Sequence, residues 1–183
     1  ATVIAKGLLV NVSRLLLAAT FIFSGFVKAV DPLGTLYKAQ DYLAALNLAG
    51  LVSDWALVIA AVLLSGIEFW LGVMLLFAIQ RRVVSKLTLV LMTVMTIITL
   101  WLVVGNPVKD CGCFGDAVKI SNGVSFAKNI VLTLCAAIVT WRPLTMVRFI
   151  SKTNQWIVTN YTALFILVTS MWCLYDLPLF DFR

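Results

Sequence analysis

The chain has 183 residues, of which 62% are hydrophobic and only 12% are charged, and its mean hydropathy is +1.05. A soluble domain carries about 25% charged residues, so this composition excludes an ordinary soluble protein and predicts an integral membrane protein. The formal net charge of +6 is then a signal of membrane orientation and not of nucleic-acid binding. The chain has no histidine, which argues against haem ligation by imidazole and against most zinc and copper sites.

Five apolar segments approach the length of about 20 residues that a helix needs to cross a bilayer. They predict an all-α bundle of about five transmembrane helices. Residues 1–183 then form a single integral membrane domain, because no polar stretch is long enough to fold separately. The predicted spans are residues 8–27, 55–77, 87–104, 126–141 and 156–174. A cleaved signal peptide is the alternative for the first span, but the segment continues into Lys28 without a small-x-small cleavage site.

The longest polar connection, residues 28–54, begins with a turn marked by Asp31-Pro32 and Gly34. Tyrosines and leucines between residues 37 and 48 then suggest a short amphipathic helix at the membrane interface. Lys28 and Asp31 are expected at the outer rim of the bundle, where a local salt bridge is the simplest arrangement.

The distribution of basic residues predicts the orientation of the chain, because cytoplasmic loops are enriched in Lys and Arg. The loops after the second and the fourth span each carry three basic residues and no acidic residue. Residues 28–54, residues 105–125 and the C-terminal tail carry at least as many acidic as basic residues. We therefore expect the N-terminus in the cytoplasm, and both polar connections and the C-terminus on the outer side.

The most distinctive motif is Val-Lys-Asp-Cys-Gly-Cys-Phe-Gly-Asp at residues 108–116. It places Cys111 and Cys113 on the predicted outer side, where disulfides persist. A disulfide across one intervening residue forms a strained ring, and Gly112 can supply the unusual backbone angles that it needs. Because a strained and exposed disulfide exchanges readily, the spacing favours a redox relay.

Other roles for these cysteines stay open at this point. Lys109 would favour the thiolate forms, whereas Asp110 and Asp116 at the outer rim oppose them. The loop cysteines could instead form an inert structural pair, for example with Cys173 near the outer end of the fifth span. A metal site is disfavoured, because two thiolates without histidine leave a tetrahedral set incomplete. Cys173 is either a packing residue or a resolving thiol, and Cys135 is expected to be a small buried hydrophobe.

Two charged residues fall inside the predicted spans, Arg14 in the first and Glu68 in the second. Both fall roughly 9–14 Å from the cytoplasmic edge at 1.5 Å per residue. Because isolated charges at this depth are costly, we expect an Arg14–Glu68 ion pair that fixes the register of the two helices. A polar floor for a quinone or proton site is the functional alternative. Gly66 and Gly72 would allow close helix contacts on the second span.

These features resemble the DoxX-type membrane proteins. The resemblance covers roughly residues 8–141. It is carried by Arg14-Leu-Leu-Leu, by Phe21-Ile-Phe-Ser-Gly-Phe-Val-Lys28 followed by Asp31-Pro32, by Glu68, and by the loop from Asp110 to Asp116. That loop is similar to the redox-associated branch that includes the methylamine-utilisation protein MauE.

The resemblance implies a four-helix core in the bacterial inner membrane, to which this chain adds a fifth span. It also implies work beside periplasmic thioredoxin-like proteins, and in some members beside quinone-reducing oxidoreductases. Our hypothesis is a thiol–disulfide oxidoreductase in which Cys111 and Cys113 exchange with such a partner and Cys173 resolves the mixed disulfide. A quinone is the candidate electron carrier, and the residues that would bind it are unknown. The alternative is a non-catalytic scaffold subunit of a larger membrane complex, with a structural disulfide in its outer loop.

Overall fold

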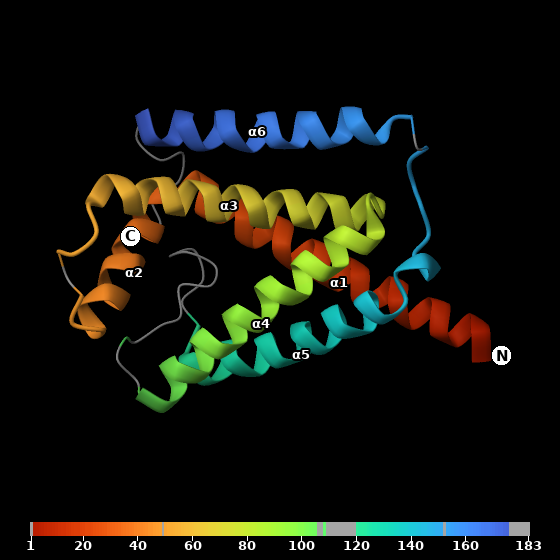
Figure 1. Ribbon diagram of the computed structural model, residues 1–183, viewed down its shortest axis with the longest axis horizontal. Coiled ribbons are helices and arrows are strands. Elements are labelled where there is room, and N and C mark those ends of the chain that lie inside the picture. Colours follow the sequence, from red (N-terminus) through yellow and green to blue (C-terminus); the bar gives the residue numbers. More distant parts are fainter. Residues whose placement is uncertain (1, 49, 106–107, 109–119, 152, 176–183) are drawn as a thin grey trace.

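The computed structural model describes residues 2–48, 50–105, 108, 120–151 and 153–175. This part of the chain contains only helices and their connections (Figure 1). The helices are α1 (Thr2–Val30), α2 (Pro32–Ala45), α3 (Asp54–Phe77), α4 (Arg81–Gly105), α5 (Asn122–Trp141) and α6 (Gln155–Tyr175), with a short 3₁₀ turn, η1 (Pro143–Thr145).

Five of these helices are long and apolar enough to cross a membrane. They are α1 from Gly7 onward, α3, α4, α5 and α6, and each contains one of the spans predicted from the sequence. The prediction of an all-α membrane protein with five spans is therefore confirmed, and the chain is a multi-pass membrane protein. Each helix runs a few residues beyond its predicted span at one end or both, because polar residues at those ends are still helical.

The first membrane helix is broken at Asp31-Pro32. Proline lacks the backbone N–H that a continuous helix would need, so α1 ends at Val30 and α2 begins at Pro32. The carboxylate of Asp31 caps α2 by accepting a hydrogen bond from the backbone N–H of Gly34 at 2.9 Å. The short helix expected between residues 37 and 48 thus starts earlier, and its first turns are buried.

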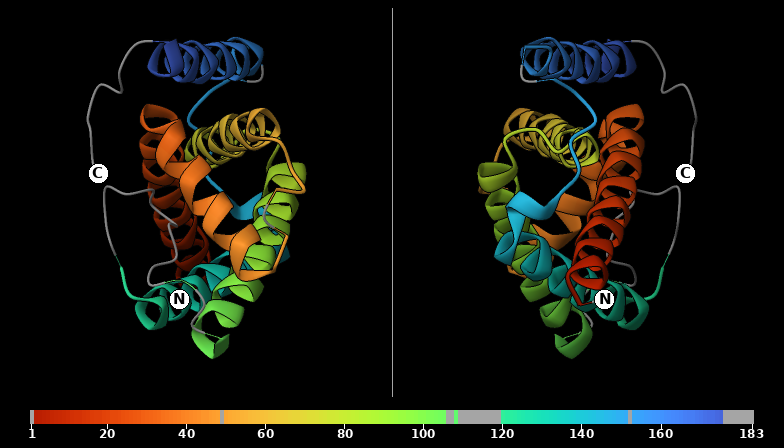
Figure 2. Two further views of the ribbon diagram at one scale, coloured as in Figure 1. Left: turned by 90° about the vertical axis from the view of Figure 1, so that its left-hand side faces the viewer. Right: turned by 90° about the vertical axis from the view of Figure 1, so that its right-hand side faces the viewer.

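The helices form a core of four, α1, α3, α4 and α5, with α6 added on one side. The tightest pair is α1 and α3, while α4 packs mainly on α5, and α5 also contacts α1. Figures 1 and 2 show α6 along α3, on the opposite side of the bundle from α4 and α5. The structure therefore has the expected four-helix core plus one further helix.

Close approach of α1 and α3 depends on two glycines. A side chain at Gly25 would collide with the backbone nitrogen of Phe69, and a Cβ at Gly72 would lie 2.7 Å from the backbone nitrogen of Ile22. Small residues at such crossings allow helix backbones to approach closely within a membrane. The crossing fixes the register of α1 on α3, and it places Ser24 and Lys28 at the level of Glu68.

Candidate functional site

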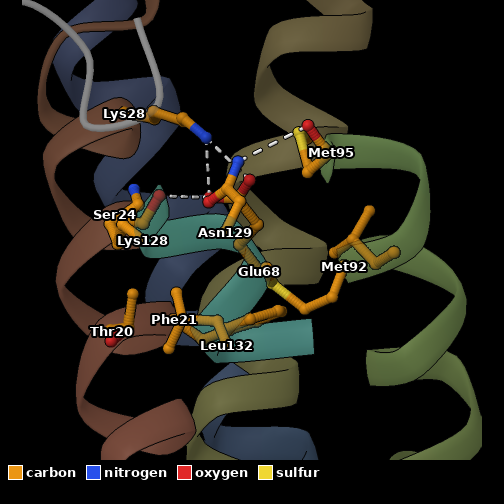
Figure 3. Close-up of a pocket in the computed structure, with 11 residues that line it drawn as sticks. Thr20, Phe21, Ser24, Lys28, Glu68, Met92, Met95, Lys128, Asn129 and Leu132 are labelled. Atoms are coloured by element: carbon orange, nitrogen blue, oxygen red, sulfur yellow. Dashed lines mark hydrogen bonds and ion pairs between the residues drawn. The ribbon is translucent and has the colours of Figure 1, made fainter. Parts of the chain in front are cut away.

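The carboxylate of Glu68 on α3 is the centre of a buried polar cluster between the helices. The ammonium group of Lys28 on α1 donates to both carboxylate oxygens, at 2.7 Å to Oε1 and 2.8 Å to Oε2. The hydroxyl of Ser24 donates to Oε2 at 2.7 Å. All three side chains are buried, and Figure 3 shows them converging on one point. An ion pair with two hydrogen bonds allows a charged carboxylate to be buried inside a membrane.

This geometry corrects the ion pair expected from the sequence, because Glu68 pairs with Lys28 in place of Arg14. The expected pair came from counting depth along two separate helices. The glycine crossing instead sets Glu68 opposite the last two turns of α1, and Arg14 lies 10 to 14 residues earlier on that helix. Lys28 and Asp31 are both buried between helices, with 4% and 3% of these residues exposed, and their placement at the outer rim of the membrane stays a prediction.

Arg14 has a different function in the fold. Its guanidinium is buried, donates from Nη1 to the backbone carbonyl of Val147 at 2.6 Å, and lies 5.0 Å from the centre of the Phe149 ring. From α4, Nη1 of Arg81 donates to the carbonyls of Leu144 and Met146, each at 2.9 Å. The two arginines thus hold the connection between α5 and α6 against α1 and against the start of α4.

Helix α5 contributes further polar residues next to this cluster. The side-chain nitrogen of Asn129 donates to the hydroxyl of Thr99 at 3.3 Å, and the hydroxyls of Thr96 and Thr133 are 2.7 Å apart. These bonds join α4 to α5 by polar contacts, as is common between membrane helices. Lys128, the neighbour of Asn129, also lies beside this cluster (Figure 3).

A cavity of about 40 Å³ lies among these residues. Its polar lining consists of Ser24, Lys28, Glu68, Lys128 and Asn129, and Thr20 lies beside them (Figure 3). The remaining lining is apolar and is contributed by α1, α4 and α5, namely Phe21, Leu91, Met92, Met95 and Leu132. Such a volume has room for one or two water molecules or a small ion.

The cysteine loop connects α4 to α5. Cys111, Cys113, Asp110 and Asp116 lie outside the described residues. The two stems of the loop are described, and Asn122 at the start of α5 joins them. Its side-chain nitrogen donates to the carbonyl of Val108 at 2.7 Å, and it lies 3.5 Å from the carbonyl of Leu102 on α4.

The other two cysteines lie within helices and have free thiols. Cys173 on α6 is almost fully buried, with 1% of the residue exposed, and Cys135 on α5 is half-buried. Helix α6, which carries Cys173, packs on α3, α1 and α2 and lies on the side of the bundle opposite α4 and α5 (Figure 2). Its role as a resolving thiol stays a prediction, and it would require this thiol to become exposed.

Sequence reasoning missed Ser24, Asn122, Lys128 and Asn129 as members of these sites. A usable signal was present for Lys128 and Asn129, because two adjacent polar residues inside an apolar segment are unusual in a membrane helix. Ser24 gave no such signal, since a lone serine is easily accommodated in a helix by bonding to its own backbone.

The comparisons with known proteins agree with the resemblance to MauE. No curated protein and no solved structure matches the chain. The family model described as methylamine utilisation protein MauE matches residues 6–142. The match spans α1 to α5, so it includes the polar cluster, the cavity and the whole cysteine loop, while α6 lies beyond it. The chain therefore belongs to the MauE family of membrane proteins.

Proposed function

We propose that this protein is a bacterial inner-membrane thiol–disulfide redox protein. Its Cys111-Gly112-Cys113 motif would exchange disulfides with a periplasmic thioredoxin-like partner. The observation that carries the proposal is the Cys-Gly-Cys spacing in a loop between two membrane helices. The hydrogen bond from Asn122 to Val108 supports it, because this bond holds together the two ends of the connection that carries the motif. Membership of the MauE family is consistent with a redox-associated role in a membrane.

The exchange balances without any further reactant. A thiolate of the reduced Cys111/Cys113 pair attacks the disulfide of the partner, which forms a mixed disulfide and releases one partner thiolate. The second cysteine of the pair then attacks the mixed disulfide. The partner leaves as a dithiol, and Cys111 and Cys113 are left as a disulfide, so two electrons have moved to the partner. The reverse sequence oxidises the partner instead.

A second reaction must reset the pair after each turnover. If the pair oxidises its partner, a lipid-soluble quinone is the proposed acceptor, taking two electrons and two protons from the dithiol to become a quinol. Cys173 is the proposed alternative resolving thiol, which would attack the mixed disulfide in place of the second loop cysteine. Its burial on α6 makes this the least direct part of the proposal.

A trapping experiment in intact membranes tests the exchange. In the Cys113→Ser/Cys173→Ser variant neither proposed resolving thiol can release the partner, so the partner should accumulate as a covalent adduct with Cys111 that reducing agent releases. The matched control is Cys135→Ser, which removes a thiol inside α5 and should trap nothing beyond wild type. Differential thiol labelling of Cys111 and Cys113, before and after mild reduction, gives their oxidation state and accessibility.

The outcomes separate the redox relay from the scaffold alternative. An adduct that contains a thioredoxin-like protein supports the relay and identifies its partner. A Cys111–Cys113 disulfide that resists mild reduction, together with no adduct in Cys113→Ser/Cys173→Ser, refutes the relay and leaves a non-catalytic scaffold subunit. Labelling of the two loop cysteines only from the cytoplasmic side refutes the predicted orientation as well.

A further inference from the structure

We propose that one end of the bundle binds the headgroup of an anionic phospholipid of the phosphatidylglycerol type. This basic end consists of the start of α4, the end of α5 and residues 142–151 of the connection to α6. Figure 1 shows these segments together, at the end of the molecule opposite α2. The surface uses none of the cysteines, so the proposal is independent of thiol–disulfide exchange.

Exposed cations are concentrated at the basic end. Arg82 and Lys86 lie one turn apart on α4, Arg142 directly follows α5, and Arg148 lies in the connection; all four are exposed. None of their side chains has a hydrogen bond or an ion pair within the part of the chain that the structure describes. The positive charges of Arg82 and Arg148 both act on Arg81, so the start of α4 and the connection bring like charges close together. Their N–H donors are available to a ligand.

No carboxylate of the described residues neutralises these cations. Asp31, Asp41 and Asp54 lie in α2, directly before it, or at the start of α3, which a hydrogen bond joins to α2. Glu68 is bound by Lys28 and lies nine residues, about 14 Å, before the end of α3. The balancing charge must therefore come from outside this part of the chain. A phosphodiester supplies it with oxygens that accept hydrogen bonds from guanidinium groups.

The connection that carries Arg148 is held against the bundle by two arginines. Nη1 of Arg81 donates to the carbonyl of Met146, and Nη1 of Arg14 donates to the carbonyl of Val147, which directly precedes Arg148. A further hydrogen bond of 2.9 Å joins the last turn of α5 to the second turn of α4. The exposed cations thus project from segments whose relative position is fixed by the fold, which lowers the entropic cost of binding a ligand between them.

Exposed apolar side chains beside the cations favour a phospholipid over a free phosphate ion. Val147 and Phe149 flank Arg148 with 54% and 58% of each residue exposed, and Trp141 beside Arg142 is 85% exposed. Two candidate membrane spans end here, at the level where lipid phosphates meet the first carbons of the acyl chains. A phospholipid would cover both the cations and the apolar side chains. An anionic headgroup is favoured, because choline or ethanolamine would add a positive charge to a basic surface.

Thermal stability in the presence of short-chain lipids tests the proposal. Delipidated protein in a neutral detergent is titrated with dioctanoyl phosphatidylglycerol, and in parallel with dioctanoyl phosphatidylcholine. We expect a saturable rise in Tm that is larger with phosphatidylglycerol, because a ligand that binds the folded state stabilises it by mass action. Inorganic phosphate at matched ionic strength, without lipid, should raise Tm less than phosphatidylglycerol does. Native mass spectrometry should show phosphatidylglycerol retained in preference to phosphatidylcholine.

Three variants locate the binding surface. Arg82→Gln/Arg148→Gln removes two exposed cations and should weaken phosphatidylglycerol binding about tenfold or more, because each basic residue near an anionic headgroup contributes about fivefold. Arg82→Lys/Arg148→Lys keeps both charges and should retain most of the binding. Lys38→Gln makes a similar change of charge on α2, at the opposite end, and should keep the wild-type lipid preference.

Three results would overturn the proposal. The first is a wild-type Tm that rises equally with the two lipids. The second is a rise with inorganic phosphate as large as that with phosphatidylglycerol, which would indicate a site for a free anion. The third is wild-type affinity for phosphatidylglycerol in Arg82→Gln/Arg148→Gln.

Discussion

Replacement of Gly72 by alanine tests whether the glycine crossing holds α1 in register with α3. A Cβ at Gly72 would lie 2.7 Å from the backbone nitrogen of Ile22, 2.8 Å from its Cγ1 and 3.0 Å from the Cβ of Phe21. No rotation of a side chain relieves the first of these contacts, because a backbone atom is involved. The two helices must therefore move apart around the Lys28–Glu68 pair, or the protein must accept the strain.

The size of the effect follows from two opposing terms. Overpacking of a close contact costs about 1–3 kcal/mol, and a clash with backbone belongs at the upper end. Alanine in place of glycine stabilises a helix by about 1 kcal/mol. Gly66→Ala on the same helix isolates the second term, because its Cβ would meet only Cγ2 of Ile166, at an ordinary 3.9 Å. The difference between the two variants is therefore the steric term, about 1–3 kcal/mol.

The assay is reversible unfolding in mixed micelles, with the free energy of unfolding compared among wild type, Gly66→Ala and Gly72→Ala. We expect Gly66→Ala to equal or exceed wild type and Gly72→Ala to fall below it. Equal stability of the two alanine variants would show that α1 and α3 are not in contact at Gly72, and the assignment of Glu68 to Lys28 would lose its structural basis.

Two further substitutions test the buried charges. Glu68→Gln leaves the ammonium of Lys28 buried without its counter-charge, so we expect a loss of about 3–5 kcal/mol in the free energy of unfolding. The Lys28→Met/Glu68→Gln double variant should recover most of this loss. Equal losses in the single and double variants would contradict a direct ion pair. Arg14→Leu removes the donor to Val147, so amide hydrogen exchange of residues 144–149 should accelerate while that of α3 stays unchanged, and unaltered exchange at 144–149 would argue against this anchor.

The membrane helices could be predicted from the sequence because their formation depends on local composition. A run of about 20 apolar residues has few alternatives to a membrane helix, and all five spans were found this way. The start of α5 was placed too late, at residue 126, because Asn122 and Ser125 are polar. Both are buried in the structure, where Asn122 bonds to the stem at Val108. Polarity marks the end of a membrane helix only where the polar residue faces water.

The pairing of charges could not be predicted in the same way, because it depends on the register between helices. Depth counted along one helix says nothing of where a neighbouring helix crosses it. Gly25 and Gly72 set that crossing, and of these only Gly72 was recognised as a contact residue. The structure also shows that Gly66, named with it, meets only a side chain of α6 at van der Waals distance. The register of α1 on α3 thus depends on contacts between residues more than 40 positions apart in the sequence, which local composition does not reveal.

The cavity and the stem of the cysteine loop share one face of α5. The buried residues of that helix include Asn122, Ser125, Asn129 and Leu132, spaced as one side of a helix requires. Asn122 binds the stem of the loop, and Asn129, seven residues or two turns further on, lines the cavity and bonds to α4. A rigid helix about 10 Å long therefore separates the two sites. Two buried polar residues of α5, Asn122 and Asn129, thus bind Val108 and helix α4 from the same face of this helix.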